Sequence, residues 1–357
     1  MAPDRIQKRL KDYASAHGQI KIMEVCGTHT SSIFRNGIRS LLSDGIRLVS
    51  GPGCPVCVTP PSAIDALVSL AQSCEVLSFG DMFRVPGSDL SLAQAKAQGA
   101  QVRLMYSPFE VVALAKERPR TQFVVAAVGF ETTAPVYAAL LETLDTEDLR
   151  NVRLYTALKT MPEVLSYICT NEAVDAFLCP GHVSAIIGSA VYEPLCAEFK
   201  KPFVIAGFEA EQILAAIYEI IDQIDKGIYA VRNLYPSVVR RDGQMQALAF
   251  MARYFVQSDS FWRGIGLIHN SGLSIADQYA RFSANEKDSG AVHSAETENV
   301  PQGCRCTDVM LGRINPDECP LFGTVCTPQH PAGACMVSAE GACGIWKNSG
   351  AGLAPRY

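Results

Sequence analysis

The chain has 357 residues, of which 48% are hydrophobic and 19% are charged, and its formal net charge is −5. This length predicts two or three domains, and the composition is that of an ordinary globular protein. The negative charge and the lack of a basic run argue against nucleic acid as a partner. No apolar stretch approaches the roughly 18–20 residues of a membrane span, so we expect no membrane partner either.

Thirteen cysteines are a high and odd number for a chain of this kind. The first residues carry mixed charges without the apolar core of a signal peptide, which predicts a cytoplasmic location. In that reducing compartment, metal sites and redox-active thiols are more common than structural disulfides. Six of the thirteen cysteines follow residue 303, and this asymmetry predicts a separate metal-binding module near the C-terminal end.

The first predicted element is an amphipathic helix within residues 1–18, with Ile6, Leu10 and Tyr13 on one face. We expect this helix to pack on the C-terminal domain. From residue 19 to residue 226, apolar β-like runs alternate with helical patterns. The predicted strands are 20–25, 46–50, 74–79, 101–105, 123–128, 152–157, 174–178 and 203–206.

Eight strands are more than one sheet usually takes in a segment of this length. We therefore predict an α/β fold with two doubly wound parallel-sheet domains, residues 19–122 and 123–226. Residues 227–357 predict a third domain, in which a helix near 244–257 and a Gly-rich apolar segment at 264–273 precede a final part with little periodicity. Because a metal would have to replace a core in that part, we expect the third domain to be largely helical or irregular.

The stretch Gly-Pro-Gly-Cys-Pro-Val-Cys at 51–57 follows a predicted strand and precedes a helical pattern. In an open α/β sheet, ligands bind beyond the carboxyl ends of the strands, so this loop is in the place where a site is expected. The C-x-x-C spacing brings the sulfurs of Cys54 and Cys57 within reach of one metal ion or of each other. The alternative is a tight turn with two buried cysteines.

A second loop after a predicted strand carries Cys26-Gly27-Thr28-His29. The thiol and the imidazole could bind one metal ion, or His29 could activate Cys26 as a nucleophile. The alternative is a helix N-terminus that Thr28 or Thr30 caps, with a packed cysteine.

Two more polar residues follow predicted strands. Glu131 could orient a ligand or complement a helix N-terminus, and His182 could be a functional imidazole or a capping and packing residue. Four other cysteines occur in apolar contexts and are expected in the core: Cys74, Cys169, Cys179 and Cys196.

The C-terminal cysteines form a more specific pattern. Intervals of 14, 6 and 16 residues separate Cys304, Cys319, Cys326 and Cys343. Zinc modules usually present C-x-x-C pairs, and none occurs in this segment. Long, uneven intervals suit an iron–sulfur cluster, whose four corner ligands need only converge in space. The third domain is therefore predicted to be an iron–sulfur domain, in which the roles of Cys306 and Cys335 stay open.

These motifs together resemble one known family. Cys-Gly-Thr-His at 26–29, Gly-Pro-Gly-Cys-Pro-Val-Cys at 51–57, Gly-Phe-Glu-Thr-Thr at 129–133 and Pro-Gly-His-Val-Ser at 180–184 occur in the order found in the [NiFe]-hydrogenase maturation factor HypD family. The cysteine-rich C-terminal segment resembles the iron–sulfur region of that family. The resemblance covers essentially the whole chain.

The resemblance implies a cytoplasmic scaffold on which the Fe(CN)2CO unit of the hydrogenase is assembled. Such a scaffold has redox activity but is not a conventional turnover enzyme. The implied partners are a small chaperone of the HypC type and a cyanide donor of the HypE type, and the protein is expected to be a monomer when alone. The implied cofactor is one [4Fe–4S] cluster.

The resemblance also assigns residues. The cluster ligands map onto Cys304, Cys319, Cys326 and Cys343. The site of the mononuclear iron, which carries cyanide and CO in transit, maps onto Cys26, His29, Cys54 and Cys57, and Glu131 and His182 complete the set of candidate functional residues.

Two other functions remain open. One is a thiol–disulfide oxidoreductase in which an iron–sulfur cluster supplies electrons to Cys54 and Cys57. The other is a zinc-dependent hydrolase that uses Cys26, His29 and a C-x-x-C thiol. The hydrolase would lack an evident general base other than Glu131, and it would leave the cysteine-rich segment unexplained.

Overall fold

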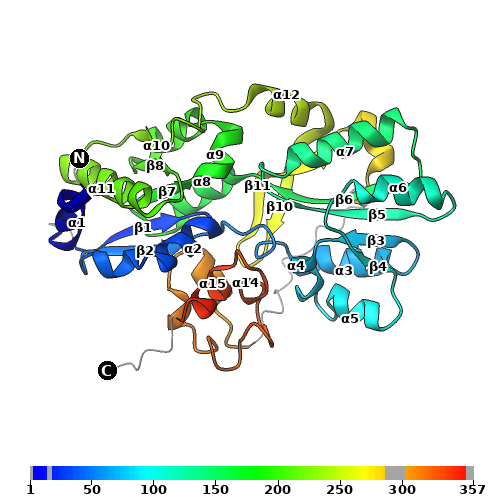
Figure 1. The fold of residues 1–357 in the computed structure, drawn as a ribbon, viewed down its shortest axis with the longest axis horizontal. Coiled ribbons are helices and arrows are strands. Elements are labelled where there is room, and N and C mark those ends of the chain that lie inside the picture. Colours follow the sequence, from blue (N-terminus) through cyan, green and yellow to red (C-terminus); the bar gives the residue numbers. More distant parts are fainter. Residues whose placement is uncertain (1–2, 14–17, 286–301, 351–357) are drawn as a thin grey trace. The chain divides into compact units, whose positions relative to one another are not determined.

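The computed structural model describes residues 3–13, 18–285 and 302–350 (Figure 1). The chain divides into two compact units, and each is formed by segments that are distant in the sequence. Unit 1 comprises Met1–Cys54, Val164–Met245 and Gly303–Tyr357, and unit 2 comprises Pro55–Glu163 and Gln246–Gln302.

Unit 1 contains a parallel sheet in the order β2-β1-β7-β8-β9. Every neighbouring pair in it is parallel, and β7 joins β1 from a distant part of the chain. The strands are β1 (Ile20–Glu24), β2 (Ile46–Ser50), β7 (Ala176–Pro180), β8 (Phe203–Ala206) and β9 (Val231–Asn233).

Helices α2 and α11 cover one face of this sheet and enclose an apolar core with it. Ile22 and Leu48 face this core, together with apolar residues of α2, α11 and the segment that follows α1. The helices and 3-10 turns of unit 1 are α1 (Pro3–Lys11), α2 (Gly27–Arg35), η1 (Ile38–Leu41), α8 (Met161–Asn171, whose first three residues belong to unit 2), α9 (Gly181–Ile187), η2 (Ala190–Tyr192), α10 (Glu193–Phe199) and α11 (Ala210–Lys226).

The N-terminal helix does not pack where the sequence predicted. Leu10 is fully buried in the core beside α11, and Arg9 pairs with Asp225 near the end of α11. Within the described ranges, α1 thus packs on α11 and not on the predicted C-terminal domain, because its apolar face completes the core under the parallel sheet.

The cysteine-rich segment lies against the other face of the sheet in unit 1. Met23 and Val49 alternate with the core residues of their strands and point to that face, where Gly312 approaches both side chains. The end of the segment also contacts α2. Its helices are short: α13 (Cys306–Met310), η4 (Pro316–Glu318), α14 (Ala334–Val337) and α15 (Ala342–Asn348).

Unit 2 contains a mixed sheet in the order β10-β11-β6-β5-β3-β4. The neighbouring strands β6, β5, β3 and β4 pair in parallel, and β11 pairs antiparallel with both β6 and β10. The strands are β3 (Glu75–Ser78), β4 (Val102–Leu104), β5 (Phe123–Gly129), β6 (Val152–Lys159), β10 (Phe255–Trp262) and β11 (Gly266–Ile275). The helices are α3 (Pro61–Leu70), α4 (Gly80–Phe83), α5 (Leu92–Ala97), α6 (Glu110–Glu117), α7 (Ala134–Thr146), α12 (Met245–Tyr254) and η3 (Asp277–Phe282).

The α/β class with two mainly parallel sheets is confirmed, and each of the eight predicted strands is present. The predicted boundary between residues 122 and 123 is wrong, because β3 and β5 pair within one sheet. The predicted domain 227–357 is also divided, since β10 and β11 extend the sheet of unit 2 while the cysteine-rich segment belongs to unit 1. Periodicity identifies strands, but it does not say which distant strands pair.

None of the helices in the described ranges is long and apolar enough to span a lipid bilayer.

The contact between the cysteine-rich segment and α2 requires a glycine at position 27. A Cβ atom there would lie 2.5 Å from the Glu340 carbonyl oxygen and 2.9 Å from the Glu340 Cα. Because these are backbone atoms, a side-chain rotation cannot relieve the overlap. We expect Gly27→Ala to lower the free energy of unfolding by about 1–3 kcal/mol, as overpacking typically does, measured by urea denaturation. The control is Gly80→Ala, whose Cβ would meet Leu104 at 3.5 Å; equal stability of the two variants would contradict the prediction.

Candidate functional site

Three of the predicted site loops lie at one edge of the sheet in unit 1. Cys54 follows β2, Cys26 and His29 follow β1, and His182 follows β7. Because these strands are neighbours and run parallel, their carboxyl ends meet at the same edge. From β1 the chain continues to β2 on one side, and β7 lies on the other side of β1. In an open α/β sheet, ligands bind at the carboxyl ends of strands that diverge in this way.

The loops that carry Cys26 and Cys54 are in direct backbone contact. The Gly51 amide donates a hydrogen bond to the Glu24 carbonyl oxygen, with 2.7 Å between nitrogen and oxygen. A Cβ atom on Gly53 would lie 2.4 Å from the carbonyl carbon of Val25 and 2.5 Å from the Cys26 nitrogen. Glycine at position 53 is thus the condition for the close approach of the two cysteine loops.

Cys26 occupies the N-cap position of α2, and its side chain makes no capping hydrogen bond. Burial raises the pKa of the Cys26 thiol to about 11, although the backbone N–H groups of His29 and Thr28 work in the opposite direction. The thiol is therefore protonated at neutral pH, and a bound metal ion would have to displace this proton.

His29 is fully buried, and its two ring nitrogens have different surroundings. Nε2 lies 3.0 Å from the Gly207 carbonyl oxygen, so Nε2 carries the proton, since a carbonyl can only accept. Burial lowers the pKa of His29 to about 4, so the ring is neutral at neutral pH. Nδ1 is buried without a hydrogen-bond partner in the described part of the chain. Metal-binding histidines commonly donate their other N–H to a carbonyl in this way, so His29 fits a metal ligand.

Glu24 is a site residue that the sequence analysis missed. It ends β1, and only 1% of its surface is exposed. One carboxylate oxygen accepts the Thr30 hydroxyl at 2.5 Å, and the other accepts the Cys26 amide at 3.3 Å. Burial raises the pKa of Glu24 to about 7. The signal in the sequence was an acidic residue at the end of an apolar strand, directly before the motif.

His182 is exposed, and its imidazole stacks on the ring of Phe208 with 4.1 Å between the ring centroids. Phe208 also contacts His29, with 4.8 Å between the centroids. His182 and His29 thus share one aromatic neighbour, which no motif of the sequence had indicated.

Cys54 and Cys57 are buried and joined in a disulfide bond. The loop between them therefore permits the two sulfurs to bond to each other, as the C-x-x-C spacing allows. In this oxidised state, neither sulfur can bind iron as a thiolate.

Glu131 lies in unit 2, directly after β5, and is 3% exposed. One carboxylate oxygen accepts the amide of Met161, the first residue of α8, at 2.7 Å. The other oxygen is buried without a partner among the described residues. Burial raises the pKa of Glu131 to about 7. The interpretation as a complement to a helix N-terminus is therefore correct in its geometry, and the unpartnered oxygen leaves capacity for a ligand.

A buried lysine in unit 2 was also missed. Lys159, the last residue of β6, donates hydrogen bonds to the Ser260 hydroxyl and the Phe261 carbonyl, and its ammonium group lies 5.1 Å from the centroid of the Trp262 ring. Burial lowers the pKa of Lys159 to about 7. Because its ammonium group donates to two oxygen atoms of β10, we assign it a role in joining β6 to β10.

The cysteine-rich segment gathers five sulfurs. The sulfurs of Cys304 and Cys306 lie 3.4 Å apart. Hydrogen bonds with Cys306 and Cys335, together with burial, raise the pKa of Cys343 well above that of a free thiol. Cys326 is close enough to Cys304 and Cys306 to be influenced by their charge, and its sulfur accepts the Ala332 amide.

The remaining predicted cluster ligand is placed differently. Cys319 follows η4 and is partly exposed, and in the described ranges its sulfur makes no hydrogen bond with the five gathered sulfurs. In the same ranges, no three His, Cys, Asp or Glu side chains are arranged to hold a metal ion as they stand. The thiols are of the donor type that an iron–sulfur cluster needs, and they are gathered in one place. Cys306 and Cys335 belong to that gathering as much as the predicted ligands do.

The four cysteines that were expected in the core are buried, as predicted: Cys74, Cys169, Cys179 and Cys196.

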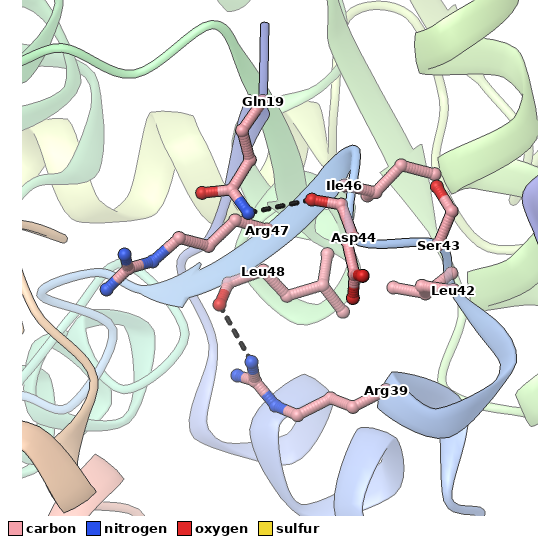
Figure 2. A pocket seen from close by; sticks show the side chains of 8 residues that line it. All are labelled: Gln19, Arg39, Leu42, Ser43, Asp44, Ile46, Arg47 and Leu48. Carbon is pink, nitrogen blue, oxygen red and sulfur yellow. Dashed lines mark hydrogen bonds between the residues drawn. The ribbon is translucent and has the colours of Figure 1, made fainter. Parts of the chain in front are cut away.

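A small cavity of about 180 Å³ lies at the free edge of β2 in unit 1, away from the motif loops (Figure 2). Arg39 donates to the Leu48 carbonyl oxygen at 2.8 Å and so covers an unpaired group of this edge strand. Gln19 donates to the Asp44 carbonyl oxygen at 2.8 Å and closes the opposite side. The cavity contains none of the predicted site residues.

A family model and several related proteins identify the same family. The model of the family described as HypD, hydrogenase formation hypA family, matches residues 2–350. A putative hydrogenase expression/formation protein of Methanocaldococcus jannaschii is 41% identical over 348 residues, which is 97% of this chain and 95% of that protein. The hydrogenase maturation factor HypD of Rhodobacter capsulatus is 41% identical over 346 residues, covering 95% and 92% of the two chains. That of Escherichia coli K12 is 39% identical over 366 residues, covering 97% and 95%.

The buried carboxyl of Glu131 predicts a specific pH dependence of stability. Its folded pKa of about 7 exceeds the ordinary value of 4.5, so its contribution to stability is complete below about pH 4.5 and is lost as the pH rises through 7. Glu131→Gln keeps an acceptor for the Met161 amide and stays neutral. Between pH 4.5 and 8, we expect the variant to gain about 3 kcal/mol relative to the wild type in urea-unfolding experiments followed by tryptophan fluorescence.

Glu75→Gln serves as the control with the opposite sign. Burial opposes the ionisation of Glu75, but its hydrogen bonds with Arg118 and Arg103 lower its pKa overall. The stabilisation by ionised Glu75 is present above the unfolded pKa, so this variant should lose stability relative to the wild type as the pH rises. A Glu131→Gln variant that follows the wild type at every pH would contradict the assignment.

Proposed function

The chain belongs to the HypD family of hydrogenase maturation factors, and on this premise we propose that it is a scaffold on which the Fe(CN)2CO unit of the [NiFe] active site is assembled. The iron is a cargo that the protein holds and passes on, not a resident cofactor. The cytoplasmic location expected from the sequence belongs to this proposal.

One observation supports the iron site above all others. The buried His29 imidazole has a protonated Nε2 bonded to the Gly207 carbonyl and an Nδ1 lone pair without a partner among the described residues. Leaving such a nitrogen unsatisfied in the interior is costly, and a metal ion is a ligand that would satisfy it. Cys26, three residues earlier, supplies a thiol at the same helix terminus.

Cys54 gives the site its redox dependence. Its loop touches the loop of Cys26, and it is bonded to Cys57. A sulfur that is part of a disulfide cannot coordinate iron as a thiolate, so reduction of the disulfide would provide up to two further thiolate ligands. Under this proposal, the oxidised state releases the cargo and the reduced state accepts it.

The proposed partners supply and receive the cargo. A small chaperone of the HypC type would share the iron through its own ligands, and a protein of the HypE type would donate cyanide. The related proteins are named as hydrogenase maturation factors, which agrees with a role beside other maturation proteins.

We assign the [4Fe–4S] cluster to Cys304, Cys319, Cys326 and Cys343, with Cys306 and Cys335 as possible replacements. Bound there, the cluster would supply or store single electrons. The gathering of the other sulfurs supports this site, whereas Cys319 is partly exposed and would have to join them.

The second candidate function is an iron–sulfur-linked thiol–disulfide oxidoreductase. The Cys54–Cys57 disulfide favours it. It differs from the scaffold because it predicts turnover of a small disulfide substrate without any HypC-type partner. The unpartnered Nδ1 of His29 has no role in that reaction, and for this reason we prefer the scaffold.

The proposed coupling of the disulfide to iron binding predicts that the fraction of disulfide and the amount of bound iron change together with potential. Across an anaerobic redox titration, thiol alkylation and mass spectrometry give the fraction of the Cys54–Cys57 disulfide, and iron in excess of acid-labile sulfide gives the mononuclear iron. We expect iron to bind as the disulfide is reduced and to be released as it forms, because a sulfur cannot serve both bonds. His29→Ala should lose this iron at every potential, whereas Cys74→Ser, a buried thiol outside the site, should behave as the wild type. Full iron occupancy in the disulfide form would end the coupling argument.

The cluster assignment predicts which thiols are needed. Cys319→Ala should lose most of the iron and sulfide of the anaerobically purified protein, because a corner ligand is removed. Cys306→Ala should retain both, and Cys196→Ala is the control for the loss of a buried thiol outside the segment. Iron and sulfide analysis decides the matter: a cluster that survives Cys319→Ala and disappears in Cys306→Ala would replace Cys319 by Cys306 in the ligand set.

A further inference from the structure

The two histidines of the motif loops in unit 1 are held by one residue that belongs to neither motif. Phe208 follows β8, and its ring lies 4.8 Å from the imidazole of His29 and 4.1 Å from that of His182, measured between centroids. The planes are inclined by 37° and 30°, respectively. Offset contacts of this kind between flat rings are favourable beyond the area that they bury.

The backbone next to this ring fixes His29 in a second way. The Gly207 carbonyl oxygen accepts the Nε2–H of His29, and the Phe208 carbonyl oxygen accepts the Ser32 hydroxyl at 2.5 Å. His29 and Ser32 are both on α2. The hydrogen bond sets the tautomer of His29, and the aromatic contact limits the tilt of its ring.

The Pro-Gly-His sequence that carries His182 leaves space for the ring of Phe208. A Cβ atom on Gly181 would lie 3.3 Å from the tip of Phe208, 3.3 Å from the Tyr235 ring and 2.7 Å from the Ala206 carbonyl oxygen. Tyr235 meets Phe208 edge-on, with 6.4 Å between the centroids. Position 181 requires glycine mainly because of the Ala206 carbonyl oxygen, and the same small residue also leaves space for the tip of Phe208.

We propose that Phe208 is a positioning residue of the iron site, which holds the imidazoles of His29 and His182 against one aromatic ring at the carboxyl edge of the sheet. The inference rests on the proposed function, since it concerns how the iron ligand His29 and the candidate functional residue His182 are held. His182 is exposed and would otherwise move among several rotamers, and ordering such a side chain during binding costs affinity. Phe208 orders it when the protein folds, so the arriving iron meets a fixed His29 ring and an ordered His182 side chain beside it in the same set of loops.

The test compares Phe208→Leu with Phe208→Tyr in the reduced, full-length protein. Isotopically enriched Fe(II) is added without air, and Mössbauer spectroscopy separates mononuclear iron from cluster iron. We expect Phe208→Leu to weaken Fe(II) binding about 10–100-fold, the usual effect of losing a group that orients a metal ligand. Phe208→Tyr keeps the ring and should restore the wild-type affinity. Phe203→Leu is the matched control, because it removes a stacked ring on β8 that contacts Phe177 and neither histidine.

A second measurement uses the reduced protein without added iron. In Phe208→Leu, the histidine ring protons of His182 should lose the shift that the aromatic neighbour causes, and the Nε2–H of His29 should exchange faster with solvent, both followed by NMR. Should Phe208→Leu fail to fold, Phe208→Met, which is flexible and of similar size, carries the same expectation.

The outcomes separate this proposal from the function on which it rests. If the wild type binds no mononuclear iron at His29, the proposed function fails, and the NMR comparison still decides whether Phe208 holds the histidines. Unchanged histidine spectra and unchanged Fe(II) affinity in Phe208→Leu would overturn the positioning role. Equal losses in Phe208→Leu and Phe203→Leu would do so as well, since they would show a general effect of lost core packing.

Discussion

The site in unit 1 depends on the parallel pairing of β1 with β2 and β7. Parallel strands place their carboxyl ends at one edge, so loops from residues 26, 54 and 182 meet although they are far apart in the sequence. The pairing brings the strands near each other, and glycine then determines how close the loops come. Gly53 lets one cysteine loop touch the other, and Gly181 lets the His182 loop approach the Ala206 carbonyl oxygen and the tip of Phe208. The motifs of this chain therefore determine how closely the backbone segments approach one another, in addition to supplying reactive side chains.

Burial gives this edge its electrostatic character. It raises the pKa of Cys26 and of Glu24 and lowers that of His29. All three groups are thus shifted toward their neutral forms, as expected where water is excluded. A metal cation that binds here meets a neutral imidazole and must release a proton from the thiol, so its affinity should rise with pH.

The sequence predicted the elements better than their assembly. Strand periodicity and strand-end motifs placed Cys26, Cys54 and His182 correctly, because these signals are local. β1 and β7 pair with each other although an inserted part of unit 2 lies between them in the sequence. No local pattern encodes this pairing. Phe208 was missed because a single aromatic residue after a strand resembles ordinary core, and Glu24 was missed because an acidic residue at a strand end resembles a surface position. The gathering of Cys306 with Cys343 is likewise set by chain folding and not by spacing.

The cysteine-rich segment shows how the two predicted metal sites are linked. Its helices have only 5, 4 and 7 residues in α13, α14 and α15 and cannot build a core of their own. The segment therefore uses the second face of the sheet, where Gly312 meets Met23 and Val49, and it touches α2 through Glu340 at Gly27. Residue 27 adjoins Cys26, and α15 begins one residue before Cys343. Any change that loosens the gathered sulfurs of this segment also removes packing from the helix that carries Cys26 and His29. The stability of one site therefore depends on the stability of the other.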